Sequence, residues 1–161
     1  MTTHINMYID SDIPLENQIV FLRQSAINFQ FNTFEVLKEK LGMEGIEIFK
    51  TILRKNYRQA IDKHKGKNFE EIKKLAGLPD KIFGLQLKHD YTKPDEFQYT
   101  ITHCPFLEES KRRGLGMDFC DIMEEVETEE VSKNLGEIAE PTRMCRGDSK
   151  CIIRMKNTLG R

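Results

Sequence analysis

Four cysteines are the most reactive side chains of this sequence, and all of them lie in its last third. Cys104 and Cys120 are sixteen residues apart in "THCPFLEESKRRGLGMDFCD", and Cys145 and Cys151 follow in "MCRGDSKCIIRMK". Cysteine thiolates act as nucleophiles and as ligands of soft metals and iron–sulfur clusters. Three roles are therefore open for these cysteines: they could be buried core residues, metal ligands or nucleophiles.

Cys104 directly precedes Pro105, a residue type that is common in the first turn of a helix. The segment "PFLEESKRR" predicts a helix that Gly114 ends, so Cys104 would be the N-cap residue. Unpaired backbone N–H groups and the helix dipole favour a negative charge at that position. We therefore expect a stabilised Cys104 thiolate, with a pKa below the usual value of about 8.5.

Cys145 and Cys151 flank the five-residue turn "RGDSK", in which Asp148 is interpreted as a turn former. In the simplest hairpin register the two cysteines would face each other, with Cβ atoms about 4.5–5.5 Å apart. That distance suits a shared metal ion or, under oxidation, a disulfide. Cys120 lies on a predicted helix and could point to the same place as Cys104. The spacings match no zinc-ribbon or zinc-finger pattern.

Hydrophobic periodicity predicts a helical front half. The pattern predicts helices over about 33–41 and 44–64, which meet at Gly42. A weaker helical pattern precedes them in "LENQIVFLRQSAINF". A short helix follows, with Asn68 as its N-cap and Pro79 marking its end.

The back half mixes strands and helices. The segments "FGLQLKHDY" and "EFQYTITH" alternate apolar and polar residues and predict a hairpin with the loop "TKPDE". A helix over Pro105–Arg113 and a second helix that continues to about Asn134 come next, followed by the strands "EIAEPTRMC" and "CIIRMK". The order predicts an α+β fold, with N-terminal helices before a ββααββ unit whose antiparallel sheet is covered by helices on one side.

The length of 161 residues suits a single domain, expected over 16–158 between a flexible segment 1–15 and a tail 159–161. Such a domain needs no metal or disulfide merely to fold. The net charge of -1 provides no basic field, so nucleic acid is not an expected partner. The sequence begins without a basic and apolar leader and contains no bilayer-length apolar run, so we predict a cytoplasmic protein without a membrane partner. In a reducing cytosol, free, catalytic or metal-bound cysteines are more common than structural disulfides.

From about Asn32 to Lys156 the chain resembles the L-2-amino-thiazoline-4-carboxylic acid hydrolase family, which is related in architecture to four-vinyl-reductase-type ligand-binding domains. The resemblance rests on "VLKEKLGMEGIEIFKTILRKNYRQA", on "TITHCPFLEESKRRGLG", on the second cysteine and on "GDSKC" before a strand. The cysteine positions of the family fall on Cys104, Cys120 and Cys151. Gly147 and Asp148 match the turn before the last cysteine, and Cys145 has no counterpart in the pattern.

The resemblance implies hydrolytic opening of a small, cyclic amidine-like sulfur compound at its C=N carbon. Cys104, Cys120 and Cys151 would hold an iron–sulfur cluster or a zinc ion with one open position, which Cys145 could close. The alternative is a nucleophilic Cys104 that Cys120 or Cys151 resolves.

A second class of function is a non-catalytic sensor or carrier of a small molecule, a metal or a redox signal. The presence of general acid or base residues discriminates a hydrolase from a carrier or sensor, because a carrier needs no such residues. Glu108, Glu109 and Asp121 lie beside the cysteines in the sequence and are the candidate carboxylates. In both cases the expected partner is a small-molecule substrate or ligand, and a homodimer is left open.

Overall fold

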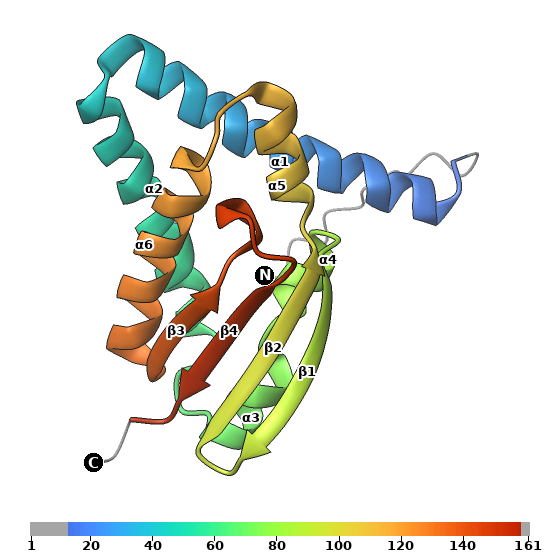
Figure 1. The fold of residues 1–161 in the computed structure, drawn as a ribbon, viewed down its shortest axis with the longest axis vertical. Coiled ribbons are helices and arrows are strands. Elements are labelled where there is room, and N and C mark those ends of the chain that lie inside the picture. The colour runs from blue at the N-terminus through green and yellow to red at the C-terminus, as the bar shows by residue number, and fades with distance from the viewer. Residues whose placement is uncertain (1–12, 159–161) are drawn as a thin grey trace, which may run out of the picture.

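The computed structural model describes residues 13–158. Its first two helices are α1 (Leu15–Leu41), which crosses the top of the molecule in Figure 1, and α2 (Met43–Asp62), which turns back and runs down the left side. The chain reverses at Gly42, whose φ of 59° lies in the left-handed region that favours glycine. The predicted tail and most of the predicted flexible segment lie outside the described residues. None of the described helices is long and apolar enough to cross a bilayer.

Helix α1 is one continuous helix where the sequence pattern suggested separate pieces. No glycine or proline interrupts it between Leu15 and Leu41, so nothing in the backbone ends the upstream helical pattern. Ile27, Phe31 and Phe34 fix its second half in the core. Its first half projects beyond the remaining elements (Figure 1) and exposes large apolar side chains, namely Leu15, Val20, Phe21 and Leu22.

Two short helices precede the sheet. Helix α3 (Phe69–Leu75) begins with the predicted cap, because Asn68 and Glu71 form a capping box. Pro79 does more than mark its end, since it lies in the first turn of a further helix, α4 (Leu78–Ile82). The buried Lys73 donates from Nζ to the carbonyl oxygen of Pro94 at 2.6 Å and so ties α3 to the first hairpin turn.

The sheet confirms the predicted α+β fold. Its strands are β1 (Gln86–Lys93), β2 (Glu96–His103), β3 (Glu137–Thr142) and β4 (Cys151–Lys156), in the spatial order β1-β2-β4-β3 with antiparallel neighbours. Helices α5 (Pro105–Arg113) and α6 (Asp118–Asn134) connect β2 to β3. The first hairpin is tighter than predicted, because Lys93 already pairs with Glu96.

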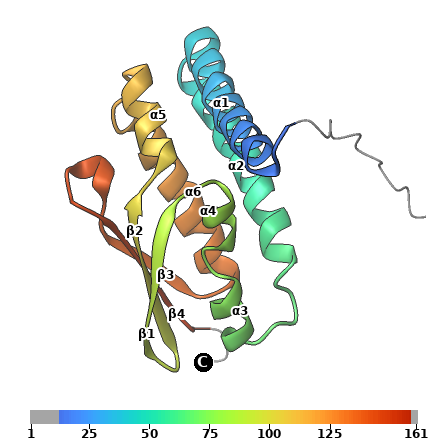
Figure 2. The same cartoon turned by 90° about the vertical axis from the view of Figure 1, so that its right-hand side faces the viewer.

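The helices cover one face of the sheet (Figure 2). Alternate residues of β2 are buried on that face, as the period of a strand requires, and Phe97, Tyr99 and Ile101 join residues of β3 and β4 in one apolar cluster. A second cluster lies among α1, α2 and α6, where the Phe31 and Phe119 rings stack with centroids 4.0 Å apart. Two cavities, described below, are lined by residues of both clusters.

The second hairpin differs from the prediction. Its last pair is Thr142 with Ile152, after which the chain leaves the sheet and forms a 3-10 helix, η1 (Met144–Arg146). Cys145 therefore lies in η1 and does not face Cys151 across a turn, which makes the predicted cross-strand pair wrong. Cys151 pairs instead with Ile101 of β2.

The register of β3 shifts between Ala139 and Thr142, around Pro141. Proline cannot donate a ladder hydrogen bond, which explains the early departure of this strand.

Candidate functional site

All four cysteines line one cavity of about 140 Å³. Cys104 reaches it from the start of α5, Cys120 from α6, Cys145 from η1 and Cys151 from the start of β4. Four separate segments of the chain therefore contribute one thiol each to the wall of the same cavity. Each of the four is a half-buried free cysteine.

Cys104 is the N-cap residue of α5, with Pro105 in the first turn, as the sequence predicted. Its pKa nevertheless moves in the opposite direction, because burial raises the pKa of the thiol to about 11. The backbone N–H groups of Leu107 and Phe106 oppose the rise, but no capping hydrogen bond to the side chain has normal geometry. The prediction of a stabilised Cys104 thiolate was therefore wrong. The free-energy cost of burying the charged thiolate outweighs the stabilisation that the helix N-terminus provides.

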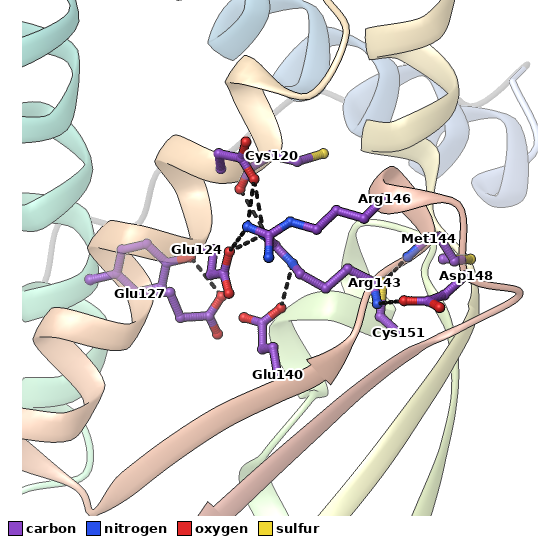
Figure 3. Close-up of polar contacts among 11 residues, drawn as sticks. Cys120, Glu124, Glu127, Glu140, Arg143, Met144, Arg146, Asp148 and Cys151 are labelled. Carbon is purple, nitrogen blue, oxygen red and sulfur yellow. Dashed lines mark hydrogen bonds and ion pairs between the residues drawn. The ribbon is translucent and has the colours of Figure 1, made fainter.

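The other thiols lie in similar surroundings. Burial raises the pKa of Cys120 to about 12, and the neighbouring Cys145 and Cys104 add to the rise. Burial also raises the pKa of Cys151, although the N–H group of Met144 donates to its Sγ at 3.3 Å (Figure 3). Near neutral pH the thiols of Cys104, Cys120 and Cys151 are therefore protonated.

The thiols share a cavity without being gathered at one point. Among the described residues, no three His, Cys, Asp or Glu side chains are arranged so that they could hold a metal ion. The predicted ligand set of Cys104, Cys120 and Cys151, with Cys145 as a fourth member, thus stays a prediction.

Arg143 organises the polar side of this cavity and is only 6% exposed. Its guanidinium hydrogen-bonds Glu124 and lies 3.2 Å from carboxylate oxygens of both Asp121 and Glu140 (Figure 3). Its backbone N–H donates to Asp148 at 2.7 Å, which confirms the turn-forming role of that aspartate. The loop between β3 and β4 is thereby fixed against α6.

Glu127 lines the same cavity and has a strongly raised pKa. Its pKa is raised to about 8, first by burial and then by the nearby Asp80 and Glu140 carboxyls. The hydroxyl of Tyr57 donates to Glu127 Oε2 at 3.3 Å. The carboxyl of Glu127 lies deep in the protein. The side chain is nevertheless only half-buried, because part of its surface faces the two cavities. Burial raises the pKa of Asp80 and of Glu140 as well.

A second, larger cavity of about 470 Å³ adjoins the first. Its walls come from α2, α3, α4, α6 and the helix-covered face of the sheet, and they are mainly apolar. The residues that line both cavities are Tyr57, Asp80, Phe106, Met123, Glu127 and Ile153. The buried carboxyls of Asp80 and Glu127 therefore stand where the thiol-lined cavity meets the apolar one.

The carboxylates that the sequence singled out are engaged elsewhere. Arg112 and Arg113 hold the pKa of Glu109 down at about 2, and Glu108 lies 3.2 Å from Nδ1 of His103. Neither glutamate lines a cavity, and Asp121 contacts Arg143 without lining one.

Sequence reasoning missed five polar residues that line the thiol-lined cavity, namely Tyr57, Asp80, Glu127, Glu140 and Arg143. For Glu127 a signal was available, because Cys120, Met123 and Glu127 recur at the spacing of one helical face.

No family model matches this chain, and no curated protein and no solved structure matches it either.

Proposed function

We propose that this protein is a small-molecule hydrolase whose chemistry takes place where the thiol-lined cavity meets the buried carboxyls. The observation that carries the proposal is the position of Glu127, which lines the same cavity as all four thiols and has a pKa raised to about 8. A carboxyl with such a pKa can both give and take a proton near neutral pH, as a general acid or base must. A mere carrier needs no such group, so the enzyme is favoured.

The substrate class follows from the sequence resemblance and is part of the proposal. A small sulfur-containing ring with a C=N carbon would add one water molecule and lose one ring bond. Glu127 would take a proton from the attacking water and return it to the leaving heteroatom. Tyr57 orients the carboxyl through its 3.3 Å hydrogen bond.

Arg143 has a different task in this proposal. Its single charge is shared among Glu124, Glu140 and Asp121, so it offsets little of the repulsion that keeps a proton on Glu127. The arginine thus holds the loop with Cys145 against α6 and leaves the titration of Glu127 to burial and to its acidic neighbours.

The donor set of the cavity suits an iron–sulfur cluster or a zinc ion, because thiolates are the ligands that such soft centres prefer. Cys104, Cys120 and Cys151 would hold the group, with Cys145 as a fourth candidate. The N–H group that Met144 directs at Cys151 Sγ is the kind of donor that stabilises a metal-bound thiolate. When bound, the group would supply Lewis acidity towards a C=N nitrogen or a water molecule.

Binding of a metal requires two changes in the protein. The sulfurs must draw together, since no described group of three ligands is prearranged. The thiols must also lose protons, because burial raises the pKa values of Cys104, Cys120 and Cys151. Metal affinity should therefore increase with pH.

The second candidate function is a non-catalytic carrier or sensor. The large apolar cavity favours it, because 470 Å³ exceeds the needs of one small ring. A carrier would release its ligand unchanged, with no bond of the ligand broken.

The test begins with protein purified without oxygen and analysed for iron, zinc and sulfide. Hydrolysis of 2-aminothiazoline-type rings is then followed over pH for the parent protein, Glu127→Gln and the matched control Glu125→Gln. Glu125 lies on the solvent-exposed side of the same helix and pairs with Lys50. We expect Glu127→Gln to lose about 100-fold or more in kcat, while the control retains activity. A protein that binds no soft metal and opens no such ring contradicts the proposal.

A further inference from the structure

The 470 Å³ cavity has the size and the lining of a small-molecule binding site. Its volume lies in the range of about 300–1,000 Å³ that is typical of small-molecule pockets, and such pockets are mostly apolar with a few polar groups. Apolar side chains from helices and sheet surround it, including Leu53, Ile72, Phe97, Val131, Ile138 and Met155. An apolar body of moderate size is therefore the natural occupant.

The carboxyl groups of this cavity are gathered at the end that it shares with the thiol-lined cavity. Asp80, Glu127 and Tyr57 belong to both walls, and Tyr99 adds a second buried phenol beside Asp80. No lysine or arginine is among the described residues that line the larger cavity. His64 does not supply a charge either, because burial and two neighbouring lysines lower its pKa.

Burial of the Asp80 and Glu127 carboxyls at the shared end of the cavities costs the folded protein free energy. The carboxyls of Asp80 and Glu127 lie in a low-dielectric region, where burial raises both pKa values and the charge of Asp80 further raises that of Glu127, so that the pair keeps a proton. A cation placed against them would satisfy both carboxylates at once. An anion would meet repulsion, and a neutral group would leave the charge uncompensated.

We propose that this cavity binds a small molecule with an apolar body and one basic nitrogen, whose cationic head pairs with the carboxylates of Glu127 and Asp80. The site goes beyond the proposed hydrolysis, because binding of this kind requires neither a thiol nor turnover. The body of the ligand would lie between α2, α6 and the sheet, with its nitrogen directed towards the thiol-lined cavity.

Calorimetric titration of the full chain with three probes of nearly equal shape tests the charge requirement. The probes are phenylbutylamine, phenylbutanol and phenylbutyrate. We expect the amine to bind about 10-fold or more tightly than the alcohol, and the carboxylate to bind most weakly. Equal affinity of amine and alcohol, preference for the carboxylate, or no binding of the amine at millimolar concentration would overturn the proposal.

Proton release provides a second readout. Because the pKa of Glu127 is about 8, that carboxyl is mainly protonated at pH 7 and must ionise when the amine binds. Titrations in two buffers of different ionisation enthalpy should show the release of up to about one proton. Amine binding without any proton release would place the cation elsewhere.

Variants locate the site. Glu127→Gln and Asp80→Asn should weaken the amine by about 10-fold and leave the alcohol unchanged, whereas Glu125→Gln should change neither probe. Val131→Phe adds bulk to the wall of α6 and should weaken amine and alcohol alike. Circular dichroism checks that each variant is folded, and unchanged amine affinity in both carboxyl variants would refute the assignment.

Discussion

Glu127 makes the stability of the folded protein depend on pH in a direction opposite to that of an ordinary salt-bridged carboxylate. Its pKa is raised from the usual 4.5 to about 8, so the folded state holds this proton more tightly than the unfolded chain does. As the pH rises above 4.5, the unfolded chain ionises first, and the free energy of unfolding falls by about 1.4 kcal/mol per pH unit. The stabilisation is complete below pH 4.5 and is lost by about pH 8, with a total of at most about 5 kcal/mol.

Glu127→Gln should remove most of this loss, because the amide is neutral at every pH. The free energy of unfolding, measured in urea from pH 5 to pH 8.5, should fall steeply for the parent and much less for the variant. At pH 8.5 the melting temperature of the variant should exceed that of the parent by on the order of 10 °C. A residual slope is expected, since burial also raises the pKa values of Asp80 and Glu140.

The matched control removes the same charge from the same helix. Glu125 is exposed and pairs with Lys50 at 2.8 Å, so Glu125→Gln should retain the pH dependence of the parent. If parent and Glu127→Gln lose stability in parallel between pH 5 and pH 8.5, Glu127 does not hold an extra proton. The reasoning about the buried carboxyls would then fail.

Three further predictions concern the same region and the core. Arg143→Met should destabilise the protein by about 3–5 kcal/mol in urea unfolding, because it leaves the Glu140 carboxyl without its cation; a loss below about 1 kcal/mol would show that the ion pairs contribute little. Cys104 has a pKa of about 11, so iodoacetamide should modify it at pH 7 at least about 10-fold more slowly than a free cysteine. If mass spectrometry shows that Cys104 is the first cysteine to be modified, the protonated thiol is refuted and the sequence-based prediction of an activated thiolate is supported. Phe119→Ala should cost about 3–5 kcal/mol because its ring is buried against Phe31, whereas Phe21→Ala, at an exposed position, should cost less than about 0.5 kcal/mol.

Local patterns predicted most of the fold. The N-cap at Asn68, the helix that begins after Cys104 and both hairpins follow from residue types within a few positions of one another. The predictions were wrong where the structure depends on residues that are distant in sequence, or on the lack of any residue that would end a helix. Helix α1 runs on because nothing interrupts it, and the loop after Thr142 leaves the sheet because Pro141 breaks the ladder and Asp148 holds the turn.

The sequence by itself determined the α+β class, the succession of the main helices and strands, and the position of three of the four thiols at element ends, because these depend on neighbours along the chain. Only the tertiary structure decided that all four thiols share a cavity with Glu127, and that Cys104 is protonated. The pKa of Glu127 depends on Asp80 and Glu140, which lie far from it in sequence and close to it in space. Desolvation and Coulomb repulsion act through space, so no reading of local spacing could assign them.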